Sequence, residues 1–230
     1  MSPVLAIPQE PDHRLDDIAA RLKAHDWVQD ALALAAAART GGGRRATKTT
    51  VLVVPSAAGV RVLRTRGKPH LVAEWEHDLV RHQLGTAAAI EWRLVEELAA
   101  GPQDLEHVDV RPAWMPIVTD VVPDPGAGGL DCRLRVPYDM AIFRGHFPSA
   151  PIVPGVLQVG WAIELAGAHG LAVGPMTGIA AAKFRRVLRP GMCLDARLER
   201  GPHPGQVHFR YTCGDTVVAT GRLQFGAAHE

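Results

Sequence analysis

In the first hundred residues, apolar positions alternate between the spacing of a helix and that of a strand. Leu15, Ile18 and Leu22 lie one turn apart and predict a helix that starts at Asp12. The same reasoning predicts a turn within residues 39–48, an amphipathic helix at 70–84, and strands at 28–36, 49–55 and 88–98. This order predicts a small α+β unit.

The second half has a different order, with one long apolar helix followed by strands. The helix is predicted at residues 156–170, and the strands at 116–122, 130–137, 176–188, 192–201, 206–213 and 216–225. A single helix with a run of antiparallel strands is typical of a curved sheet wrapped around that helix. The periodicity lapses around residues 99–116, so we predict an α+β chain with domains at 1–112 and 113–230.

Composition narrows the class of protein. The chain has 230 residues, of which 47% are hydrophobic and 21% charged, which is ordinary globular usage. No apolar run approaches the roughly 18 residues of a membrane span, and the first residues lack the pattern of a secretion signal, so we predict a cytoplasmic protein. The formal net charge of +1 gives no general attraction to nucleic acid.

The cysteines indicate neither a disulfide framework nor a metal site. Cys132, Cys193 and Cys213 are odd in number and widely spaced, without a CxxC pair. We predict three buried thiols and no bound metal.

The segment from His146 to Gly155 carries the strongest candidate chemistry. Pro148, Pro151 and Pro154 restrict the backbone just before a helix whose first residue is Gly155. A helix N-terminus presents unpaired N–H groups and a positive partial charge, which suits an oxyanion. His146 lies nine residues earlier, where it could remove a proton from the carbon beside a polarised carbonyl.

Two motifs carry a family resemblance over residues 113–230. The stretches "GHFPSAPIVPGVLQ" and "AAAKFRRVLRPGM" resemble signatures of the hotdog-fold 3-hydroxyacyl-ACP dehydratases, and "VLQVGWA" is similar to their aryl polyene subgroup. The resemblance implies a lyase in which His146 is the catalytic base and the Gly155 N–H holds the thioester oxygen. It also implies a substrate carried on the phosphopantetheine of an acyl carrier protein, no further cofactor, and a homodimer or higher homo-oligomer.

One position departs from the family pattern. Fourteen residues after the histidine the family carries Glu or Asp, where this chain has Gly160. Losing one positioned acid typically removes about two to four orders of magnitude of rate. Glu164 lies one helical turn further along the same face, so it is the candidate substitute, with a plain surface carboxylate as the alternative.

The remaining candidate site residues each have a second interpretation. Phe147 and Trp161 line either the core or an acyl tunnel, and Pro154, Gln158 and Gly160 belong to the same predicted substrate cradle. The basic residues downstream are a solvated strand edge or a surface for the phosphopantetheine phosphate and the acidic carrier protein. They are Lys183, Arg185, Arg186 and Arg189.

The N-terminal half has a weaker resemblance. Segments such as "RLDDIAARLKAHDWVQDALALAA", "TTVLVVPSAAG" and "IEWRLVEEL" follow the order of the C-terminal subdomain of adenylate-forming acyl and aryl ligases. That subdomain continues into a motif with a lysine that contacts the adenylate. Here no lysine occurs between Lys68 and Lys183, which indicates a degenerate subdomain kept for stability or docking.

Three functions therefore stay open. The first is a 3-hydroxyacyl-ACP dehydratase in fatty acid or aryl polyene type biosynthesis, impaired by Gly160. The second is a binding protein for acyl carrier protein without catalysis, and the third is a hotdog thioesterase that attacks the same bound thioester with water.

Overall fold

The computed structural model describes residues 13–39, 45–84, 90–98, 113–124, 126, 128–172 and 174–226. The middle of the turn predicted at 39–48 and most of the predicted junction at 99–116 lie outside the described residues, and residues 45–48 belong to a strand instead of the turn. Contacts divide the chain into two compact units, Met1–Pro112 with Phe147–Pro151, and Ala113–His146 with Ile152–Glu230.

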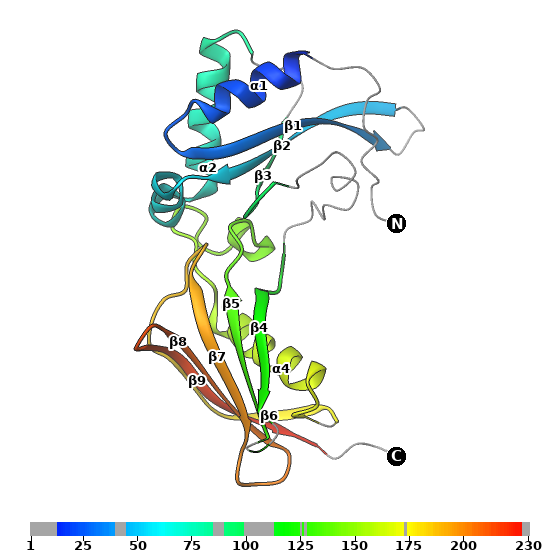
Figure 1. Cartoon of the computed structure of the whole chain (residues 1–230), viewed down its shortest axis with the longest axis vertical. Helices are drawn as coiled ribbons and strands as arrows, with labels where there is room; N and C mark the ends of the chain where they lie inside the picture. Colours follow the sequence, from blue (N-terminus) through cyan, green and yellow to red (C-terminus); the bar gives the residue numbers. More distant parts are fainter. Residues whose placement is uncertain are drawn as a thin grey trace. The chain divides into compact units, whose positions relative to one another are not determined.

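The N-terminal unit is a three-stranded sheet with helices (Figure 1). Strand β2 is central, antiparallel to β1 and parallel to β3. Helix α1 packs along β1. The elements are α1 (His13–Lys23), β1 (Val28–Arg39), β2 (Arg45–Pro55), α2 (Ala57–Arg81) and β3 (Glu91–Leu94).

Helix α2 starts earlier than the apolar pattern predicts. Ser56 caps it by accepting a hydrogen bond from the Gly59 N–H, and a first helical segment precedes the predicted one. The two segments meet at Gly67, whose φ of 78° and ψ of 170° are not helical, and Pro69 follows in the first turn of the second segment. Glycine and proline at this junction concealed the first segment from sequence analysis.

A bidentate ion pair joins the two helices of this unit. The Arg21 guanidinium of α1 donates to both carboxylate oxygens of Asp78 on α2, each at 2.7 Å. The hydrogen bond from Arg21 holds the pKa of Asp78 below the usual range of an aspartate. A depressed folded-state pKa stabilises the fold above the unfolded-state pKa, near pH 4, and this stabilisation disappears as pH falls through the folded pKa.

We therefore expect Asp78→Asn to lower the free energy of unfolding at pH 7, with an effect that shrinks as pH falls below about 4 and disappears below the folded-state pKa of Asp78. Urea unfolding at pH 7 and at an acid pH below that folded-state pKa measures this difference. Asp17→Asn is the matched control, since Asp17 is exposed on α1. A loss of stability that is the same at both pH values would contradict an electrostatic role for Asp78.

The C-terminal unit is a curved antiparallel sheet around one helix, as the sequence predicts (Figure 1). Its strand order is β4-β5-β7-β8-β9-β6, so β4 and β6 are the edges. The elements are β4 (Ile117–Asp124), β5 (Gly129–Arg135), the 3-10 turn η1 (Ala141–Arg144), α4 (Gly155–Ala168), β6 (Met176–Phe184), β7 (Cys193–Arg200), β8 (Gln206–Cys213) and β9 (Thr216–Phe225).

The core of this unit forms between α4 and the inward face of the sheet. Trp161, Ala162 and Leu165 of α4 pack in one buried cluster with alternate residues of the strands, such as Leu134 and Leu198. Alternation sends every second strand residue outward. No helix in the described part of the chain is both long and apolar enough to cross a membrane.

The cysteine prediction is wrong at two of three positions. Cys132 is buried, whereas Cys193 and Cys213 are exposed. Burial, with a contribution from Asp131, raises the pKa of the Cys132 thiol to about 11, so it stays protonated at neutral pH. Alternation places Cys193 on the outward face of β7, and Cys213 is the last residue of β8.

Gly221 on β9 leaves room for a buried aromatic ring of the neighbouring strand. A Cβ at this position would overlap the Phe209 ring and lie 3.0 Å from the Ala181 carbonyl oxygen. We expect Gly221→Ala to reduce the free energy of unfolding by about 1–3 kcal/mol through overpacking. Gly178→Ala on β6 is the control, because a Cβ there meets nothing within 4 Å. Chemical unfolding compares the two variants, and equal stability would refute the packing role of Gly221.

Candidate functional site: the N-terminus of the central helix

Helix α4 starts at Gly155 with unpaired donors. Pro154 is the N-cap in an extended conformation, with φ of −66° and ψ of 151°, and its side chain provides no capping hydrogen bond. The Pro154 carbonyl accepts from the N–H groups of Leu157 at 3.1 Å and Gln158 at 3.3 Å. Among the described residues, nothing accepts from the N–H groups of Gly155 or Val156. These two donors are therefore available to an oxyanion.

The tertiary structure brings the two sequence motifs together at this helix start. Val153 and Leu188 form an isolated antiparallel bridge in which the Val153 N–H donates to the Leu188 carbonyl at 2.9 Å. The Phe184 ring lies over Gly155, where a Cβ would stand 2.6 Å from the ring. The chain leaves β6 at Phe184 instead of continuing to Leu188 as predicted, because the backbone after Phe184 turns to pair with Val153.

Gln158 is buried and stabilises the segment that leads into α4 through hydrogen bonds. Its side chain is 2% exposed, and Nε2 donates to the Val153 carbonyl at 3.2 Å. Its own carbonyl accepts from the Tyr211 hydroxyl of β8 at 3.1 Å. Burial raises the pKa of Tyr211, so the hydroxyl remains a donor. The Oε1 atom of Gln158 is buried and finds no partner among the described residues. Gln158 thus ties the helix start to the strand that packs behind it.

His146 follows the short turn η1. Its backbone N–H donates to the Ile142 carbonyl at 2.9 Å, and its side chain is half-buried. Phe143 of this turn packs in the same core cluster as Val153 and Val159 of the helix entry. The next residue, Phe147, has φ of 54° and is 58% exposed, so it does not line the core of the described structure.

Gly160 and Glu164 have different surroundings on α4. A Cβ built at Gly160 meets nothing within 4 Å, so the helix has open space beside this residue. Glu164 is exposed and lines a shallow hollow of about 400 Å³ with Ile163, Met176 and Phe225. No feature of the helix forces glycine at position 160, because a Cβ fits there.

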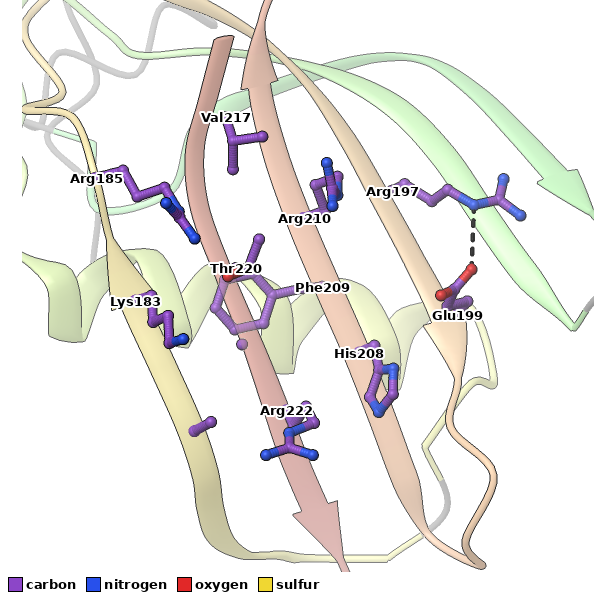
Figure 2. Close-up of a pocket in the computed structure, with 12 residues that line it drawn as sticks. Lys183, Arg185, Arg197, Glu199, His208, Phe209, Arg210, Val217, Thr220 and Arg222 are labelled. Atoms are coloured by element: carbon purple, nitrogen blue, oxygen red, sulfur yellow. Dashed lines mark hydrogen bonds and ion pairs between the residues drawn. The ribbon is translucent and has the colours of Figure 1, made fainter.

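The other predicted site residues lie in two places. Trp161 is fully buried, and its indole N–H donates to the Trp114 carbonyl at 3.1 Å, which makes it a core residue. Lys183 and Arg185 line a hollow on the face of the sheet that is turned away from α4 (Figure 2). Arg186 is exposed, and its backbone N–H donates to the Val218 carbonyl at 3.3 Å.

The match to a known protein family lies in the C-terminal unit. A family model described as ApeI dehydratase matches residues 125–222. A 3-hydroxyacyl-(acyl-carrier-protein) dehydratase FabZ from Erythrobacter litoralis is 38% identical over 97 residues, 37% of this chain and 63% of the relative. The chain therefore spans less than two thirds of that relative.

Two further FabZ relatives are covered more fully. The protein from Chloroflexus aggregans is 35% identical over 114 residues, 44% of this chain and 77% of the relative. That from Lactobacillus helveticus is 30% identical over 132 residues, 52% of this chain and 89% of the relative. The chain belongs to the FabZ dehydratase family. Among solved structures, the dehydratase heterocomplex ApeI:P from Xenorhabdus doucetiae matches with 27% identity and a TM-score of 0.44, covering 47% of this chain and 96% of that one.

Sequence analysis of this chain missed Phe184 and the hydrogen bonds of Gln158. Phe184 lies inside the second family motif, so the motif was a signal, but its contact with Gly155 depends on the turn after β6. In the described part of the chain, no group of three or more His, Cys, Asp or Glu side chains is arranged to hold a metal ion.

Proposed function

We propose that the C-terminal unit converts a 3-hydroxyacyl thioester, carried on the phosphopantetheine of an acyl carrier protein, to the 2-enoyl thioester and water. The observation that supports this most directly is the start of α4, where the unpaired N–H groups of Gly155 and Val156 lie next to the bridge that joins both family motifs. No cofactor beyond the carried substrate is needed in this proposal.

The proposed reaction starts at C2. The thioester oxygen accepts a hydrogen bond from the Gly155 N–H, which stabilises the negative charge that develops when His146 removes the C2 proton. The electron pair of that C–H bond then forms the C2–C3 double bond, and hydroxide leaves from C3. Gly160 has no acidic side chain that could donate a proton. His146 therefore returns the proton that it removed from C2 to the leaving hydroxide, and water forms.

A homodimer is part of the proposal. Strand β6 is an edge strand of the described sheet, and it presents three exposed apolar side chains, Met176 at 38%, Ile179 at 48% and Phe184 at 45%. An unpaired edge with apolar side chains is suited to pairing with another chain. We propose that a second copy pairs there. The cytoplasmic location and the ligase resemblance of residues 1–112 stay predictions of the sequence.

The lack of a carboxyl group at Gly160 favours a second candidate, a protein that binds acyl carrier protein without turnover. The test is the absorbance of the enoyl thioester when purified protein meets a 3-hydroxyacyl carrier protein or its aryl polyene counterpart. Formation of enoyl thioester supports the dehydratase. Binding without any reaction supports the carrier-binding protein, and release of free acid and thiol would instead reveal a thioesterase.

A further inference from the structure

A basic hollow lies on the sheet face that is turned away from α4. It encloses about 650 Å³ and is lined from four strands, β6, β7, β8 and β9. Figure 2 shows the side chains of Lys183, Arg210 and Arg222 extending from the strands on this face, with the ribbon of α4 behind the sheet. Arg185, which follows β6, completes a group of four exposed cations.

The register of the strands gathers these cations around a floor of small residues. Thr220 of β9 is paired with Lys183 of β6 on one side and with Arg210 of β8 on the other. Arg222 lies two residues further along β9, on the same face, and is paired with Ala181. Adjacent strands are about 4.7–4.9 Å apart, so three cationic side chains start close to one hydroxyl. Like charges at such spacing repel and lower stability.

No carboxylate compensates for this repulsion within the described chain. Lys183, Arg185, Arg210 and Arg222 form no ion pair with another described residue. The neighbouring Arg197, in contrast, forms three ion pairs, with Asp124 at 3.3 Å, Asp131 at 2.6 Å and Glu199 at 3.3 Å. The positive potential is therefore concentrated on the β6, β9 and β8 side of the face.

The surroundings favour a compact anion over an extended one. Beyond Arg197 the adjoining hollow has mixed charge, because Asp120, Asp131 and Asp195 line it together with Arg133, Arg197 and Arg210. A long polyanion laid across the strands would meet these carboxylates. The Phe209 ring in the basic hollow is 2% exposed and offers no open face on which a base could stack, and the half-buried His208 ring has its Nε2 2.9 Å from Gln206 Oε1. Arginine forks match the geometry of phosphate oxygens.

We propose that this hollow is a binding site for a compact polyanion with clustered phosphate groups. The site lies on the opposite face of the sheet from the α4 N-terminus, so it is independent of the proposed dehydration. The same phosphate chemistry has two sources, a free polyphosphate or the phosphate end of a pantetheine-bearing coenzyme.

Calorimetric titration of the full chain with inorganic triphosphate at low ionic strength tests the proposal. We expect saturable binding that weakens as salt is added. Arg210→Ala and Arg222→Ala should each lower the affinity by at least about tenfold, since each removes a charge-assisted contact. Arg66→Ala is the charge-matched control, because Arg66 is exposed on α2, far along the chain from the hollow, and it should leave the affinity unchanged.

Competition distinguishes the two sources. Displacement of triphosphate by coenzyme A would assign the site to a coenzyme's phosphate end, and binding of triphosphate that coenzyme A does not displace would assign it to a free polyphosphate. Thermal unfolding verifies that each variant is folded. Absence of triphosphate binding, equal affinity in all three variants, or tighter binding of a short DNA duplex than of triphosphate would overturn the proposal.

Discussion

Gly160→Glu raises the rate of dehydration by about two to four orders of magnitude if the C-terminal unit has the proposed activity. The substitution places a carboxyl group fourteen residues after His146, where the family has its acid. The side chain starts in open space, because a Cβ at position 160 meets nothing within 4 Å. A positioned acid donates a proton to the leaving hydroxyl, a step for which the natural chain has only the proton held by His146.

The measurement is turnover of a 3-hydroxyacyl carrier protein, followed by enoyl thioester absorbance. Gly160→Ala is the matched control, because it fills the same space with a methyl group and carries no proton. It should stabilise the helix by about 0.5–1 kcal/mol and leave the rate unchanged. Equal turnover in the glutamate variant and the natural chain would show that the acid is not limiting or comes from elsewhere. Glu164→Gln would then test the nearest carboxylate on the same helix face.

His146→Ala is expected to abolish most of the turnover, by about two to four orders of magnitude. His146 is the proposed base, and in the absence of a carboxylate at position 160 it is also the proposed source of the proton for the departing hydroxide. Both steps depend on one imidazole, so the loss should persist when Glu is placed at position 160. The double variant His146→Ala/Gly160→Glu measures this dependence directly.

Controls separate this chemical role from a structural one. His146 is half-buried and follows a turn that packs in the core, so the melting temperature of His146→Ala must be compared with that of the natural chain. Affinity for the acyl thioester on its carrier protein should be retained, because the donors of α4 that hold the thioester oxygen are untouched. A folded His146→Ala variant with full turnover would disprove the assignment of His146 as the base.

Local sequence was sufficient to predict the central helix and to indicate the candidate catalytic groups. The helix predicted at 156–170 is confirmed at Gly155–Ala168, because Pro154 and Gly155 mark its start and its apolar residues are consecutive over several turns. The strands that surround it are confirmed for a similar reason, since alternation of apolar and polar residues is a local property. The motif around His146 is also contiguous in the chain, so its residues alone were enough to indicate the family.

The other features of the fold and of the site depend on contacts between residues that are distant in the chain. The end of β6 at Phe184 depends on the pairing of Val153 with Leu188, and the space beside Gly160 depends on which side chains pack around α4. The basic hollow exists because strand register places Lys183 and Arg210 on either side of Thr220. Register joins residues far apart in the chain, and a one-residue slip would send them to the other face. For this protein, the sequence alone determined which chemical groups are present and which helix carries them, and only the tertiary structure decided which of those groups meet.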